Sequence, residues 1–143
     1  AATLPAGHFV TAFIGLLDPA AHRLRFISGG QSPILHWHAA DRRCSLHKAG
    51  SFPMGAMPIV ALRPAVTIDF APGDVLALLT DGVYEQENGR AEQFGLARVE
   101  AVLGQHADTP AADLAGALLS ALRTFADSQL QEDDVTMVLL KRR

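Results

Sequence analysis

Residues 72–85 read Pro72-Gly73-Asp74-Val75-Leu76-Ala77-Leu78-Leu79-Thr80-Asp81-Gly82-Val83-Tyr84-Glu85, and they say more about the architecture than any other segment. The first three residues are a turn signal, and the run from Val75 to Thr80 that follows is almost entirely apolar. Such a run predicts a strand that is covered on both faces, so other layers of structure must lie above and below it. The strand delivers Asp81 to its C-terminal end, directly before a glycine.

The segments on the N-terminal side of this strand predict further short strands. They are rich in β-branched and aromatic residues, or they alternate between polar and apolar residues as half-buried strands do. The predicted strands cover residues 9–17, 23–28, 34–38, 44–48 and 66–70. The turn signal Asp18-Pro19 separates the first two, which are therefore expected to form a hairpin.

On the C-terminal side, the apolar residues recur at spacings of three and four, which is the period of a helix. Helices are predicted over residues 94–103 and 109–127, the second with Thr109 as its N-cap and Pro110 at its first helical position. A last apolar strand is predicted over residues 135–140, and it is expected to insert beside earlier strands. A run of strands followed by helices indicates an α+β fold.

The composition fits one globular domain over residues 1–143 and argues against two classes of protein. Hydrophobic residues make up 49% of the chain, charged residues 19%, and the net charge is −3. A nucleic-acid-binding domain would cluster Lys and Arg, whereas the only basic run here is Lys141-Arg142-Arg143, which is typical of a solvated tail. No segment reaches the ~20 apolar residues that a membrane span needs.

The first residues and the single cysteine bear on location. Ala1 to Pro5 lack the charged region of a signal peptide, and without an initiator Met they suggest a piece cut from a longer chain. Because Cys44 is the only cysteine, no internal disulfide is expected, which suits a reducing cytosol. We therefore expect a cytoplasmic protein. Two arginines precede Cys44, but no group of residues typical of a nucleophilic site accompanies it.

Two acidic segments stand at the ends of predicted core strands. Asp81 follows the strand of residues 75–80, and Asp133 and Asp134 come just before the strand of residues 135–140. A charge near a core is costly unless it is paired, hydrogen-bonded or bound to a metal. Hard divalent cations such as Mg²⁺ take oxygen ligands, and two metal ions can clamp a phosphoryl group. The alternative is that these acids only stabilise turns, in which Asp and Gly are common.

Two further patterns would indicate another class of phosphatase or a zinc site, and in each the sequence lacks a residue that the site needs. A haloacid-dehalogenase-like phosphatase needs a second Asp two residues from the first, and the positions around Asp81 are Leu79 and Val83, which excludes that class. His36 and His38 stand two residues apart on a predicted strand and share one face, so the pair could bind zinc. Structural zinc sites usually have four ligands, and the sequence identifies no third one.

Several motifs, taken in order, resemble the SpoIIE-type bacterial branch of the metal-dependent serine/threonine protein phosphatases of type 2C. The resemblance covers nearly all of the chain, and residues 72–85 are its most specific part. The other matching motifs are Phe9-Val10-Thr11-Ala12-Phe13 with Leu17-Asp18, Ile27-Ser28-Gly29-Gly30-Gln31-Ser32-Pro33, Pro53-Met54-Gly55, Phe94-Gly95 and Asp133-Asp134-Val135-Thr136-Met137-Val138.

The resemblance implies a partial α/β/β/α sandwich of antiparallel strands with flanking helices. It implies that Asp81 and Asp133 are metal ligands, with Asp134 beside them as a further candidate, for Mn²⁺ or Mg²⁺ and two ions per intact domain. A metal-activated water would then hydrolyse phosphoserine or phosphothreonine, with no protein nucleophile. The implied substrate is an anti-anti-sigma-type phosphoprotein in bacterial signalling, and the parent chain would carry an upstream sensor or receiver domain.

The chain departs from the family pattern in two respects. The family's first metal-binding aspartates precede the first hairpin, and nothing resembling them occurs here, so we expect the C-terminal part of a domain that is inactive alone. Its open sheet edges would favour oligomerisation. The second departure is Gln31, which stands where the family has a histidine. Two other interpretations stay open: a non-catalytic phosphatase-like module that binds or regulates a partner, and a plain α+β ligand-binding domain.

Overall fold

The computed structural model describes residues 5, 7–57, 63–127 and 133–143. In chain order the elements are β1 (Ala12–Asp18), β2 (Arg23–Gly29), β3 (Ile34–His38), β4 (Arg43–His47), β5 (Val66–Asp69), β6 (Val75–Leu79), α1 (Asp81–Tyr84), α2 (Gly95–His106), α3 (Ala111–Ala126) and β7 (Met137–Lys141). This order confirms the predicted α+β class. Within the described ranges, no helix is long and apolar enough to cross a membrane.

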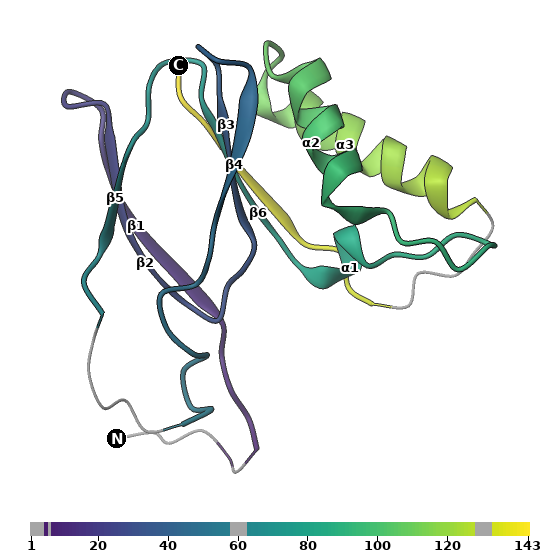
Figure 1. Ribbon diagram of the computed structural model, residues 1–143, viewed down its shortest axis with the longest axis horizontal. Helices are drawn as coiled ribbons and strands as arrows, with labels where there is room; N and C mark the ends of the chain where they lie inside the picture. The colour runs from purple at the N-terminus through teal and green to yellow at the C-terminus, as the bar shows by residue number, and fades with distance from the viewer. Residues whose placement is uncertain (1–4, 6, 58–62, 128–132) are drawn as a thin grey trace.

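The strands form two antiparallel sheets, and helices cover one of them (Figure 1). One sheet has three strands in the order β1-β2-β5, and the other has four in the order β4-β3-β6-β7. Helices α2 and α3 lie on the face of the four-stranded sheet that points away from the other sheet (Figure 1). The last strand, β7, pairs with β6, with Met137 opposite Leu79, which confirms that it inserts beside an earlier strand.

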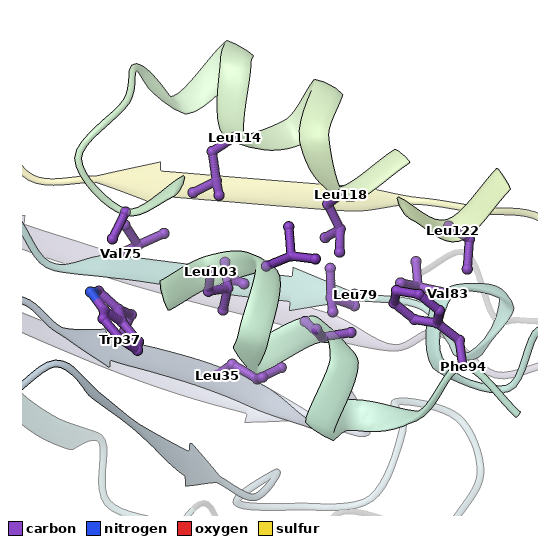
Figure 2. Packing of buried hydrophobic residues seen from close by; sticks show 14 residues of the cluster. Leu35, Trp37, Val75, Leu79, Val83, Phe94, Leu103, Leu114, Leu118 and Leu122 are labelled. Atoms are coloured by element: carbon purple, nitrogen blue, oxygen red, sulfur yellow. The ribbon is translucent and has the colours of Figure 1, made fainter. Parts of the chain in front are cut away.

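The larger core lies between the four-stranded sheet and the two long helices (Figure 2). Leu35 and Trp37 of β3 and Leu79 of β6 point toward the helices. They belong to one buried cluster with Leu103 of α2 and with Leu114 and Leu118 of α3. Burying one such side chain stabilises the fold by about 1.5–3 kcal/mol. This packing fixes the four-stranded sheet against the helical layer.

The smaller core lies between the two sheets. Its buried members are Leu24, Phe26, Ile34, Phe70 and Leu76. Ile34 and Leu76 belong to the strands that also build the larger core, but they point to the opposite face because side chains alternate along a strand. Strand β6 is therefore covered on both faces, as its apolar sequence predicts.

The other face of the three-stranded sheet is open among the described residues. On β1, Ile14 is 62% exposed and Leu16 is 71% exposed, whereas Phe13 and Leu17 pack against the smaller core. The described chain thus has three layers, a sheet, a second sheet and the helices. This arrangement is the partial sandwich of antiparallel strands with flanking helices that the family resemblance implies.

The boundaries of several elements differ from the predictions. Strand β1 begins at Ala12 rather than at residue 9, and β7 begins at Met137 rather than at residue 135. The prediction of Thr109 as the N-cap of α3 is wrong, because Pro110 occupies that position. The Thr109 hydroxyl instead donates to the carbonyl oxygen of His106, at 2.8 Å, after the end of α2. Helix α1 was not predicted, since four residues carry no helical period.

Candidate functional site

The two predicted acidic segments meet at one end of the four-stranded sheet. Thr80 follows β6, and its backbone N–H donates to the carbonyl oxygen of Thr136 at 3.0 Å. In return, the N–H of Thr136 donates to the Thr80 hydroxyl oxygen at 2.9 Å. The Thr80 hydroxyl itself donates to the carbonyl oxygen of Asp134 at 3.0 Å. Thr80 therefore extends the β6–β7 pairing beyond both strands and ties the segment before β7 to the segment after β6.

Gly82 lets these two segments approach so closely. A Cβ atom at this position would lie 2.6 Å from the carbonyl oxygen of Asp134 and 3.2 Å from that of Asp133. Real Cβ atoms do not approach backbone oxygens to 2.6 Å. The absence of a side chain at Gly82 therefore lets the Asp81-Gly82 turn lie against the Asp133-Asp134 backbone.

The three carboxylates of this corner are exposed to solvent. Asp81 begins α1, and its Oδ1 accepts a hydrogen bond from the N–H of Gly82 at 3.1 Å. Asp133 Oδ1 accepts from the N–H of Asp134 at 2.7 Å. Carboxylate oxygens from two adjoining segments, open to water, are the donor type that a hydrated Mg²⁺ or Mn²⁺ takes. The corner fits such ions, and the assignment of Asp81, Asp133 and Asp134 as ligands stays a prediction.

Gln31 reaches the same end of β6 from the loop after β2. Its side-chain Nε2 donates to the backbone carbonyl oxygen of Leu79 at 2.9 Å, and its backbone carbonyl oxygen accepts from the Ser28 hydroxyl at 2.7 Å. The loop is packed tightly, because a Cβ atom on Gly30 would lie 2.5 Å from Pro53. Gln31 thus attaches the loop after β2 to Leu79, the residue before Thr80. The sequence does not reveal this contact.

A second polar cluster lies between the two sheets. His36 and Asp74 are both buried, and His36 Nε2 lies 3.2 Å from Asp74 Oδ2. The His38 ring centroid lies 3.9 Å from that of His36, and His38 Nε2 bonds with the Ser45 hydroxyl at 2.8 Å. Burial lowers the pKa of His36, although the hydrogen bond with Asp74 acts in the opposite direction. Burial also lowers the pKa of His47.

Cys44 is poorly suited to act as a nucleophile. Burial, together with the negative charge of Glu100, raises the pKa of its thiol from 9.0 to about 11. Only the thiolate attacks an electrophile, so the reactive fraction at neutral pH is very small.

Alkylation of Cys44 by iodoacetamide at pH 8 should accordingly be about a hundredfold slower in the folded chain than in the chain unfolded in urea. The factor follows from a pKa that is higher by about two units in the fold. Mass spectrometry of timed samples measures both rates. Glu100→Gln is the matched variant and should speed the reaction of the folded chain, whereas equal rates in the folded and unfolded chains would contradict the assignment.

The fold is that of a PP2C phosphatase domain. The chain superimposes on the SiaA-PP2C domain of Pseudomonas aeruginosa with a TM-score of 0.78 at 22% identity, covering 93% of this chain and 52% of that one. The RsbU and RsbW domains of Rv1364c from Mycobacterium tuberculosis give a TM-score of 0.70 at 24% identity, over 93% of this chain and 37% of that one. The SpoIIE phosphatase domain of Bacillus subtilis, described as presoaked with Mn, gives 0.68 at 17% identity, over 92% and 56%.

The sequence places the chain more narrowly. The profile of the family described as "Stage II sporulation protein E (SpoIIE)" matches residues 1–143, and the chain belongs to this family. Protein IcfG of Synechocystis sp. is 29% identical over 141 residues, a match that covers 94% of this chain and 21% of IcfG. The chain therefore spans about half of the SiaA and SpoIIE phosphatase domains and a fifth of this longer relative.

Proposed function

We propose that this chain is the C-terminal part of a metal-dependent protein phosphatase domain that hydrolyses phosphoserine or phosphothreonine. The observation that carries the proposal is the set of hydrogen bonds between Thr80 and the Asp134–Thr136 segment. These bonds bring two acidic segments together at one end of the four-stranded sheet. Acids that only stabilised their own turns would not need this contact between segments that are more than fifty residues apart in sequence.

Asp81 and Asp133 would hold the Mn²⁺ or Mg²⁺ ions, with Asp134 beside them, and further ligands would come from outside this chain. When bound, a metal pair supplies an activated water as the nucleophile and neutralises charge on the phosphoryl group. The residues of this chain orient the ligands: Gly82 admits the neighbouring backbone, and the Thr80 hydroxyl fixes the distance between the two segments. The anchoring of Gln31 on Leu79 supports the same corner.

The substrate would be a phosphoprotein of the anti-anti-sigma type, and the parent chain would carry a sensor or receiver domain. Both follow from the family resemblance, and the small share of IcfG that the chain covers leaves room for other domains. No nucleic acid or membrane enters this function, and the parent protein would act in the cytoplasm. The exposed apolar side chains of β1 would be covered by the rest of the domain or by a second copy.

The test is phosphatase activity on p-nitrophenyl phosphate with Mn²⁺. This chain should be compared with a protein extended N-terminally through the segments in which the family carries its first metal-binding aspartates, each with and without Asp81→Asn. We expect Mn²⁺-dependent activity only in the extended protein with Asp81, and loss of that activity with EDTA. Absence of activity in every form would overturn the proposal in favour of a phosphatase-like module that regulates a partner by binding.

A further inference from the structure

The polar cluster between the sheets lies far from the acidic corner. His36 and His38 stand on β3 and point into the space between the sheets, and Asp74 precedes β6, the neighbouring strand. Asp74 and Asp81 flank opposite ends of β6, so about 20 Å of extended chain separates them. The proposed phosphatase chemistry makes no use of this cluster.

Asp74 is held in a fixed orientation. Its Oδ1 accepts from the N–H of Ala39 at 2.8 Å, and its Oδ2 accepts from the N–H of Ala71 at 2.9 Å. His36 Nε2 lies 3.2 Å from the same Oδ2. Two ligand atoms on one tetrahedral Zn²⁺ are about 3.3 Å apart, since Zn–N and Zn–O bonds are about 2.0–2.2 Å. The carboxylate and the imidazole are therefore already spaced as a pair of zinc ligands.

The cluster holds more imidazole nitrogens than hydrogen-bond partners. His36 Nδ1 and His47 Nε2 are buried, and neither has a partner among the described residues. The rings of His36 and His47 lie 5.9 Å apart. Buried polar atoms are almost always satisfied, so two unpartnered nitrogens in one small cluster call for an additional group. An ion between the sheets takes one nitrogen of His36, the Nε2 that faces Asp74, so a water bound to that ion would satisfy His47 Nε2, whereas His36 Nδ1 stays without a partner among the described residues.

We propose that His36, His38 and Asp74 bind one Zn²⁺ between the sheets. One nitrogen or oxygen of each lies within 4.8 Å of the others, so small side-chain rotations bring all three onto one ion. Two imidazoles and one carboxylate are a ligand set that zinc accepts, and they favour it over Mg²⁺, which takes oxygen ligands. A water completes the tetrahedron and can bond with His47. His38 is only half-buried, so solvent reaches one of the three ligands.

Cobalt provides the direct test, because Co²⁺ in a tetrahedral nitrogen and oxygen site absorbs visible light strongly. The purified chain, carrying Asp81→Asn to remove one of the three candidate ligands of the acidic corner, is titrated with Co²⁺ and then with Zn²⁺. We expect one Co²⁺ per chain, a visible band that Zn²⁺ abolishes, and a melting temperature raised by about 8 °C when free Zn²⁺ is 100 times Kd. A chain that shows no band and no shift overturns the proposal.

Two variants locate the ion. His38→Ala should weaken Co²⁺ binding at least tenfold, and its half-buried position leaves the His36–Asp74 pair in place, so that circular dichroism should still report a folded chain. His22→Asn is the control on an exposed turn with φ of 51°, which Asn tolerates, and should bind as the parent does. Unchanged binding in His38→Ala, or loss of the band in the control, would reject this site.

Discussion

Asp81→Asn is expected to lower kcat/KM of the N-terminally extended protein about a thousandfold on p-nitrophenyl phosphate with Mn²⁺. An amide is neutral, so it binds a hard divalent ion far more weakly than a carboxylate of the same shape does. Losing about 4 kcal/mol of the charge stabilisation that a metal supplies corresponds to a factor of this size. Steady-state rates at several Mn²⁺ concentrations measure it.

Asp69→Asn is the matched control. Asp69 is an exposed carboxylate on β5, and its only described ion pair is a long one with Arg23, at 4.0 Å. It should leave the rate within about twofold of the parent, because surface pairs of this kind contribute little. If Asp81→Asn retained most of the activity, or if both variants lost it equally, Asp81 would not be a ligand.

Gly82→Ala should destabilise this chain by about 3 kcal/mol, the upper end of the range for overpacking. The added methyl group would lie 2.6 Å from the carbonyl oxygen of Asp134, and a backbone oxygen cannot turn away as a side chain can. Gly82 does not have the positive φ that would itself disfavour alanine, so the contact alone determines the cost. Urea denaturation followed by circular dichroism gives the free energy of unfolding.

Gly116→Ala provides the opposite control within the same chain. Gly116 lies in α3, and a Cβ atom there would have no neighbour within 4 Å. Alanine has the higher helix propensity, so this variant should be more stable by up to about 1 kcal/mol. Equal effects of the two substitutions would show that the Asp133-Asp134 backbone does not pack against Gly82. In the extended protein, Gly82→Ala should also reduce the Mn²⁺-dependent rate, because it separates the two acidic segments.

The sequence predicts this corner of the molecule well for a physical reason. An apolar strand is buried on both faces, so the position where it ends is fixed, and the acid that follows it is fixed too. The reasoning holds less well for the last strand, because β7 lies at the edge of its sheet with Val138 and Leu140 exposed, and it begins two residues later than predicted. That β7 pairs with β6, and that the two acids therefore lie at one end, follows from the pairing of Leu79 with Met137, which no local pattern encodes.

The polar cluster between the sheets could not be predicted from local sequence patterns. The spacing of His36 and His38 predicts a shared face, but Asp74 is 38 residues away from His36 and has the sequence context of an ordinary turn. Only the pairing of β3 with β6, with Trp37 opposite Val75, brings the acid beside the histidines. The same limit applies to Gln31, whose contact with Leu79 spans 48 residues. Pairing between distant strands decides both.

The hydrogen bonds of Thr80 also bear on how the sequence can change without loss of the site. They attach the segment before β7 to the end of β6. The position of Asp134 therefore depends on how β6 and β7 pair, and not on where α3 ends. One residue added between Asp134 and Met137 would shift the acids relative to Thr80. Natural variation in length should therefore be absent between the acids and β7.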